Sequence, residues 1–226
     1  MRHFILTAFL FLTACVGGGP QSGDILLLGD SVMAWNGSDN ADIGNVIADR
    51  LDRRVSVRAV PGAQFDNASG LASAVGFDIQ AQYPGGAWNW VVLNGGANDL
   101  GFDDCGCGDC ARVVDALIGP DAATGKIPAF LNRLRASGSR VLWMGYYTSP
   151  GTSFAGCTDD LIVLEGRIAR YAEARGDTFF FDGEDVIVRE NPDHFANDDT
   201  HPSREGSALL GTALADLIAR AEGRSQ

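Results

Sequence analysis

Short apolar runs rich in β-branched and aromatic residues alternate along this chain with segments of amphipathic, helical pattern. The runs are apolar through their middles, which is typical of strands covered on both faces. They are DILLLG (24–29), RRVSVRAV (53–60), WNWVVLNG (88–95), SRVLWMGYY (139–147) and DTFFFDG (177–183). We expect helices over residues 39–51, 64–75, 111–135 with a break near Gly119 and Pro120, 158–175 and 202–221.

Strands and helices that take turns along a chain predict a parallel sheet with right-handed crossovers and helices on both faces. We therefore expect a single three-layer α/β/α domain with a five-stranded parallel sheet. The chain has 226 residues, of which 46% are hydrophobic, enough for one sizeable core. No internal repeat or long low-complexity run indicates a second domain.

The first residues, MRHFILTAFLFLTAC, have the pattern of an export signal. Arg2 precedes an apolar run, Phe4 to Leu12, that is too short to span a bilayer. The ending resembles the lipobox of bacterial lipoproteins, in which Cys15 becomes the lipidated first residue; an ordinary secretory signal with an incidental cysteine is the alternative. We expect a signal peptide over 1–14 and a flexible tether over 15–23. The protein would then lie in the cell envelope of a bacterium, facing the periplasm or the exterior.

The charge balance excludes one class of partner. Lys and Arg number 17 against 29 Asp and Glu, for a formal net charge of -12. Such a surface repels phosphate backbones, so we expect no nucleic-acid partner. Membrane association would come only from the N-terminal lipid, and we expect a monomer.

Four cysteines remain after Cys15. An even number of thiols in an exported chain favours two disulfides, with three connectivities that the sequence leaves open. A structural zinc site is the alternative, because CGCGDC and one distant cysteine can supply four thiolates. The GCGDCA stretch matches a dinucleotide-binding pattern, but it does not directly follow a strand. The candidates are Cys105, Cys107, Cys110 and Cys157.

Polar and small residues gather where the expected strands end. Ligands of parallel sheets bind beyond the carboxyl ends of the strands, so these segments would meet at one rim. They are Gly29 to Ser31, Pro61 and Gly62, Gly95 to Asp99, Tyr146 to Thr148, and Asp198 to Pro202 before the final helix.

Ser31 and His201 are candidates for nucleophilic catalysis. A serine hydroxyl needs a base within about 3 Å to take its proton, and Asp198 can bond one imidazole nitrogen of His201, leaving the other to face a serine. Taken alone, a serine in the position of Ser31 more often caps a helix, and Asp198 with His201 is equally a surface turn. His194 lacks such an arrangement, and we expect it to pack within its loop.

Asn98 and Gly62 are candidates for binding an oxyanion. Small residues around Asn98 leave its amide free to enter a cleft, and Gly62 can offer a bare backbone N–H. Each is also an ordinary turn residue when considered singly. Asp30 and Asp99, beside them, are expected to brace loops through backbone amides.

Four segments together resemble the SGNH hydrolase superfamily, also called GDSL esterases and lipases: GDSV at 29–32, Gly62, GAND at 96–99 and DDTHP at 198–202. The resemblance implies a flavodoxin-like hydrolase domain over 24–226 without cofactor or metal. It implies Ser31 as nucleophile, His201 as general base and then acid, and Asp198 as the residue that orients it. The implied oxyanion donors are the backbone N–H groups of Ser31 and Gly62 and the amide of Asn98. Val32 stands where the family's GDSL motif has leucine.

The substrate is less constrained. Trp35, Tyr146 and Tyr147 are tentative pocket residues, with at most one of the tyrosines facing the cleft, and Trp35 is equally a core residue. We expect disulfides to hold the loop from Leu100 to Cys110 as one wall of the site.

The expected activity is hydrolysis of short-chain acyl or O-acetyl esters, for example of carbohydrates, because no long apolar flap is present. The ester would be a small molecule or a glycan. The alternatives are a lysophospholipase or thioesterase, an acyltransferase, and a non-catalytic binding module.

Overall fold

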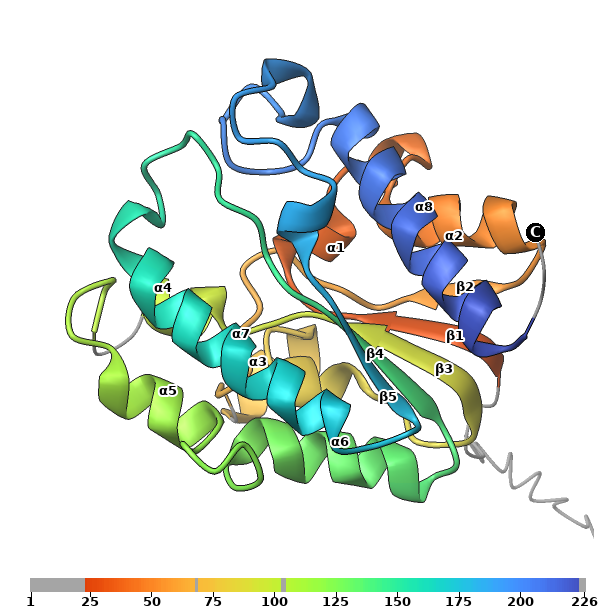
Figure 1. Cartoon of the computed structure of the whole chain (residues 1–226), viewed down its shortest axis with the longest axis horizontal. Coiled ribbons are helices and arrows are strands. Elements are labelled where there is room, and N and C mark those ends of the chain that lie inside the picture. The colour runs from red at the N-terminus through yellow and green to blue at the C-terminus, as the bar shows by residue number, and fades with distance from the viewer. Residues whose placement is uncertain (1–22, 68, 103–104, 224–226) are drawn as a thin grey trace, which may run out of the picture.

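Parallel strands form one five-stranded sheet in the order β2-β1-β3-β4-β5 (Figure 1), in a computed structural model that describes residues 23–67, 69–102 and 105–223. This confirms the predicted sheet. The strands are β1 Gly23–Leu28, β2 Val55–Val57, β3 Trp88–Leu93, β4 Arg140–Met144 and β5 Thr178–Phe181.

The strand β1 lies inside the sheet and is covered on both faces. Ile25 pairs with Val55 of β2 on one side and with Trp90 of β3 on the other. Side chains of a strand alternate between the two faces, and Ile25 and Leu26, on opposite faces, are both fully buried. This is why the run reads as continuously apolar.

Helices cover both faces of the sheet, which makes three layers. Figure 1 shows α1, α2 and α8 over one face and α5, α6 and α7 over the other. Each face of the sheet has its own hydrophobic core, and successive residues of a strand belong to opposite cores. Leu27 packs in the core on the side of α2 and α8, and Leu26 packs in the core on the side of α6 and α7. The helices are α1 Ser31–Ala34, α2 Ile43–Leu51, α3 Gly70–Val75, α4 Ala97–Phe102, α5 Ala111–Leu117, α6 Lys126–Ala136, α7 Thr158–Glu173 and α8 Arg204–Ala221.

The helix expected over 64–75 is wrong in its first half. Gln64 forms a parallel β-bridge with Asp78, so the chain is extended there. The helix α3 begins only after Ser69, whose hydroxyl accepts a hydrogen bond from the backbone N–H of Ala72.

Other helix and strand boundaries also differ from the predicted ones. The first expected helix starts four residues later, because Asp42 caps α2, and the break between α5 and α6 covers residues 118–125. Helix α4 was not expected at all. The strand β1 begins at Gly23, which the sequence assigned to the tether.

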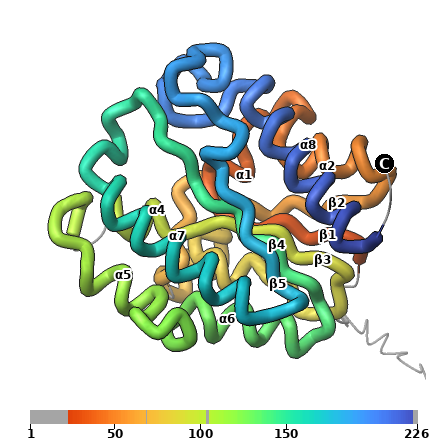
Figure 2. Tube along the Cα trace, in the orientation of Figure 1, coloured from red at the N-terminus to blue at the C-terminus, as the bar shows by residue number. Residues whose placement is uncertain are grey.

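The connections that leave the carboxyl ends of the strands rise from the same end of the sheet. Figure 2 shows the β4–α7 and β5–α8 connections extending beyond that end, near α1. This places the segments before His201 and after Tyr146 close to Ser31.

Candidate active site

The turn between β1 and α1 presents Ser31 at the carboxyl edge of the sheet. Gly29 has a φ of 138°, and a Cβ atom there would lie 2.0 Å from the side-chain oxygen of Asn94. Asp30 caps α1 by accepting a hydrogen bond from Val32 N–H at 3.0 Å. The strand can therefore turn here only at a glycine, and Ser31 becomes the first residue of the helix.

Asp30 is buried and joins this turn to the segments that follow β3 and β4. Its Oδ1 accepts from the side-chain amide of Asn94 at 2.9 Å, and its Oδ2 accepts from the hydroxyl of Tyr146. Burial raises the pKa of Asp30, although the hydrogen bonds from Tyr146, Asn94 and Val32 act in the opposite direction. Asp30 thus braces the loop, as expected from its place beside Ser31.

Ser31, His201 and Asp198 form a chain of hydrogen bonds across 170 positions of sequence. The Oγ of Ser31 lies 2.8 Å from Nε2 of His201, and Nδ1 of His201 lies 2.6 Å from Oδ2 of Asp198. A carboxylate can only accept, so Nδ1 carries the proton and Nε2 is left to accept from the Ser31 hydroxyl. The arrangement can activate a serine.

Asp198 is ionised and firmly oriented. Partial burial would raise its pKa, but hydrogen bonds from the imidazole and backbone N–H of His201 and from Thr200 N–H outweigh burial and lower the pKa. The Oδ1 accepts from the N–H groups of His201 at 3.0 Å and Thr200 at 3.1 Å. The carboxylate therefore faces His201 in one fixed orientation.

Trp35 stacks on the imidazole of His201. The ring centroids are 3.7 Å apart and the planes differ by 7°. The next residue, Asn36, donates to the carbonyl of Pro202 at 3.1 Å and to Ser207 Oγ at 2.9 Å. The segment after Ser31 is thus fastened to the segment that carries His201, and Trp35 is half-buried at the site.

Three potential donors lie around Ser31. Val60 O accepts from Ala63 N–H, and Gly62 between them has a φ of 81°, as in a type II turn with Pro61 at its second position. Among the described residues, no acceptor faces the backbone N–H of Ser31 or of Gly62. Both N–H groups are therefore available to a ligand.

Asn98 lies in the first turn of α4, and its buried amide is the third donor. One of its N–H bonds points to the carbonyl of Ala63 at 2.9 Å, which fixes the plane of the amide and leaves the other N–H available. The neighbouring Asp99 accepts from the N–H groups of Phe65 and Asp66. Asp99 therefore braces the Gly62 loop against α4.

Two hollows of different size meet at Ser31. One is a cavity of about 50 Å³ with mostly apolar walls, and the other is an open groove of about 430 Å³. Both are lined by Ser31, Asn98 and His201. We call them the small cavity and the groove; Trp35 and Gly62 line the groove.

Both tyrosines after β4 line the small cavity, so the expectation that at most one faces the cleft is wrong. The strand ends at Met144, and the alternation of side chains ends with it. Tyr146 is held through its hydroxyl by Asp30, and Tyr147 donates to the carbonyl of Thr200 at 3.2 Å. Burial raises the pKa of both phenols well above its ordinary value.

Sequence reasoning missed Phe154, Leu161 and Asn94. Phe154 and Leu161 line the small cavity from the β4–α7 connection and from α7, and no motif marks them. Asn94, a buried polar residue at the end of a strand, carried a usable signal, because a buried amide needs partners.

Cys105 is bonded to Cys110, and Cys107 to Cys157. This confirms two disulfides over the zinc alternative and selects one of the three connectivities. The cysteines themselves do not line the small cavity or the groove, but Gly101 and Phe102 at the start of the loop line the groove.

His194 is buried, and its Nδ1 accepts from Val188 N–H at 2.9 Å. The signal segment 1–14, Cys15 and the tether to residue 22 lie outside the described residues, so export and lipidation stay predictions. Within the described residues, no helix combines the length and hydropathy that a membrane span requires.

Residues 27–209 match the GDSL-like lipase/acylhydrolase family. Among curated proteins, no sequence matches the chain significantly.

Solved structures of low sequence identity are similar over most of the chain. A protein assigned to the SGNH hydrolases, from Slackia heliotrinireducens, is 20% identical, with a TM-score of 0.61 over 88% of this chain and 100% of its own. A carbohydrate acetylesterase family member from Sinorhizobium meliloti is 18% identical, with a TM-score of 0.64 over 89% and 99%. The inhibitor-bound aryl esterase of M. smegmatis is 14% identical, with a TM-score of 0.64 over 88% and 99%. At these identities the likeness establishes the fold.

Proposed function

The chain belongs to the GDSL-like lipase/acylhydrolase family and is a carboxylic ester hydrolase, and on this premise we propose that it hydrolyses short acyl esters through an acyl-enzyme on Ser31. The observation that carries the proposal is the hydrogen-bond chain from Asp198 through His201 to Ser31.

In the first half of the reaction, Ser31 Oγ attacks the ester carbonyl carbon while its proton passes to Nε2 of His201. The bond from that carbon to the alcohol oxygen breaks, and the alcohol leaves with the proton from His201. The ionised Asp198 stabilises the imidazolium that forms between the two steps. The acyl group remains on Ser31.

In the second half, water attacks the acyl-enzyme and gives its proton to His201. The bond to Ser31 Oγ breaks, the acid departs, and the proton returns to Ser31. In both halves the carbonyl oxygen becomes an anion, which the N–H groups of Ser31 and Gly62 and the spare N–H of Asn98 would stabilise.

The small cavity favours a short acyl group. An apolar cavity of about 150 Å³ holds a benzene ring, whereas the small cavity measures about 50 Å³. It is about a third of that size, which suits acetyl and its nearest homologues. A lysophospholipase or thioesterase of long acyl chains would need a longer channel.

The groove suits a bulky, polar alcohol such as a sugar. It joins aromatic walls from Trp35 and Phe102 to the polar side chains of Ser153 and Thr200. The similarity to a carbohydrate acetylesterase family member supports this class of alcohol. An acyltransferase would use the same acyl-enzyme, with a sugar hydroxyl in place of water.

The test combines covalent labelling with a substrate series. A fluorophosphonate probe should label the protein on Ser31, and Ser31→Ala should abolish both labelling and turnover. Ser153→Ala is the matched control, because Ser153 lines the groove without a base and should leave labelling unchanged. Aryl esters of increasing acyl length should show their highest kcat/KM at acetate or propionate, and acetylated glycans should release acetate.

Each rival has its own outcome. No labelling of the wild type would indicate a binding module, and a rate maximum at long acyl chains would contradict the short-acyl proposal. Acylated sugar in place of free acid, when a sugar acceptor is added, would indicate an acyltransferase.

A further inference from the structure

A second cavity of about 70 Å³ lies beside the small cavity. Its far side is lined by residues of the β4–α7 connection, of α7 and of the turn after β5, including Thr148, Ile162, Glu165 and Glu184. The two cavities share the walls Tyr146, Tyr147, Ser149, Phe154 and Leu161. We call this second space the rear cavity.

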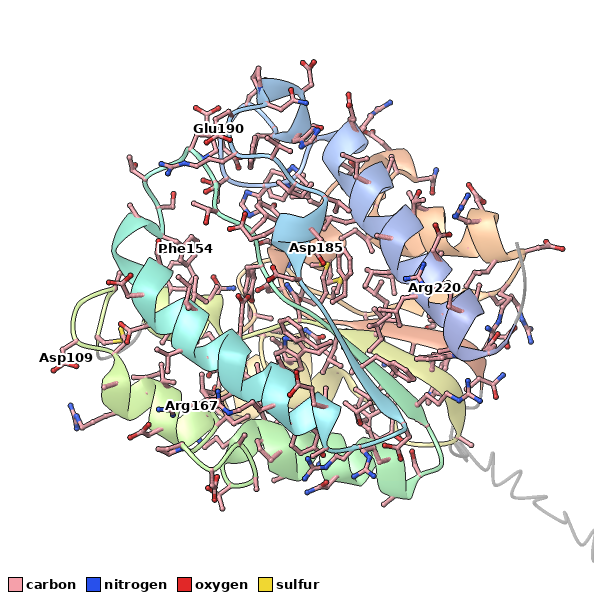
Figure 3. All side chains as sticks on the ribbon, viewed as in Figure 1. Asp109, Phe154, Arg167, Asp185, Glu190 and Arg220 are labelled. Atoms are coloured by element: carbon pink, nitrogen blue, oxygen red, sulfur yellow. A yellow bond between two sulfur atoms is a disulfide. The ribbon has the colours of Figure 1, made fainter. Side chains whose placement is uncertain are left out.

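Phe154 lies at the junction of the three spaces. Among the described residues, it alone lines the small cavity, the rear cavity and the groove. Figure 3 shows Phe154 near the N-terminal end of α7. Phe154 therefore borders both the space next to Ser31 and the space behind it.

The ring of Phe154 is held from two sides. On α4, a Cβ atom at Gly101 would lie 2.6 Å from the ring, and the ring of Phe102 packs against it edge-on, with centroids 6.3 Å apart. On its own segment, the carbonyl of Phe154 accepts from Cys157 N–H at 2.9 Å, and Cys157 is bonded to Cys107.

The other large side chains that line both the small cavity and the rear cavity are held by different contacts. The hydroxyl of Tyr146 donates to Asp30 and that of Tyr147 to the carbonyl of Thr200, while Leu161 belongs to the long helix α7. Phe154 is the shared aromatic wall whose position depends on the loop and its disulfide.

We propose that Phe154 sets the longest acyl group that this enzyme accepts, and that the Cys107–Cys157 disulfide holds Phe154 in that position. The inference rests on the proposed hydrolysis of short acyl esters, with the acyl group in the small cavity. Truncating the ring joins the small cavity to the rear cavity and gives the acyl chain room for several more methylene groups. The carboxyl groups of Glu165 and Glu184 limit the gain for still longer chains.

The first test compares Phe154→Ala with Phe77→Ala, using acetate, butyrate, hexanoate and dodecanoate esters of one phenol. One methylene in an apolar pocket is worth at least about tenfold in specificity. Phe154→Ala should therefore raise the hexanoate-to-acetate ratio of kcat/KM by at least about tenfold. Phe77→Ala removes a partly exposed ring that lines none of the three spaces and should keep the wild-type ratio. An unchanged ratio in Phe154→Ala overturns the proposal.

The second test separates the two disulfides. Replacing Cys107 and Cys157 together by alanine should raise the same ratio, by less than Phe154→Ala does. Replacing Cys105 and Cys110 together should change it less, because the Cys107–Cys157 bond then still ties the loop to the segment of Phe154. Equal ratios in the two double variants would refute the role of the Cys107–Cys157 bond.

Thermal unfolding of every variant shows whether it is folded at the assay temperature. If Phe154→Ala is not folded, Phe154→Leu decides the question, because it shortens the wall without emptying it and should shift the ratio in the same direction. A wild type that hydrolyses none of the esters would refute the proposed function. A wild type that prefers acetate, with variants that keep its profile, would refute only the role of Phe154.

Discussion

Glu165 should make the stability of this protein depend on pH. It lies on α7, and its carboxylate accepts from the backbone N–H of Tyr146. Burial raises its pKa from 4.5 to about 7; the charges of Asp182 and Glu184 add to this, and the hydrogen bond from Tyr146 opposes it. The folded protein thus keeps a proton that the unfolded chain has already released.

The sign and size follow from proton linkage. Between pH 4.5 and about 7 the folded state binds more protons than the unfolded state, so the free energy of unfolding falls as pH rises. Each pKa unit corresponds to about 1.4 kcal/mol. Glu165 therefore does not lower the free energy of unfolding below pH 4.5, and it lowers that free energy by about 3 kcal/mol above pH 7.

Glu165→Gln tests this reasoning, because glutamine cannot ionise but still accepts from Tyr146 N–H. Urea unfolding near pH 5 should give similar midpoints for wild type and variant. At about pH 8 the variant should be more stable by up to about 3 kcal/mol, with an unchanged m value. Glu190→Gln, in the exposed loop after β5, is the control for loss of one negative charge. A wild-type-to-variant difference that stays constant from pH 5 to pH 8 would refute the argument.

Two further predictions concern the proposed chemistry. Asn98→Ala should lower kcat by about 100- to 1,000-fold, the usual cost of one oxyanion donor, with little change in KM; a loss below about threefold would remove Asn98 from the oxyanion site. Trp35→Ala should lower kcat up to about tenfold, because a stacked aromatic pair contributes about 0.5–1.5 kcal/mol, and Trp35→Phe should restore most of it. Circular dichroism melts check that each variant is folded, and equal kcat for the two Trp35 variants would contradict a positioning role.

Local pattern was enough to predict the sheet. The runs that became β1 and β3 are apolar through their middles because both of their faces are covered there, and this leaves a direct trace in the sequence. Helix boundaries leave a weaker trace in the sequence than buried strands do. The stretch that begins at Gln64 has a helical pattern, but Gln64 itself pairs with Asp78 in a β-bridge and α3 begins only at Gly70.

Part of the active site also leaves a trace in the sequence. Ser31, Asn98 and His201 follow strands or precede a helix in a fixed order, and parallel topology brings such segments to one edge. That order was visible in the sequence, so the residues were predicted before any distance was known. The structure adds the distances between them.

The sequence by itself determined the sheet, the family and the residues that gather at its carboxyl edge, because each depends on local pattern or on chain order. The tertiary structure decided how side chains from distant segments meet. Trp35 lies on the face of His201, Phe154 lines two cavities, and Cys107 pairs with Cys157 rather than with a nearer cysteine. These contacts join residues 50 or more positions apart in the sequence, and only the packing of the helices and loops above the sheet sets which of them touch.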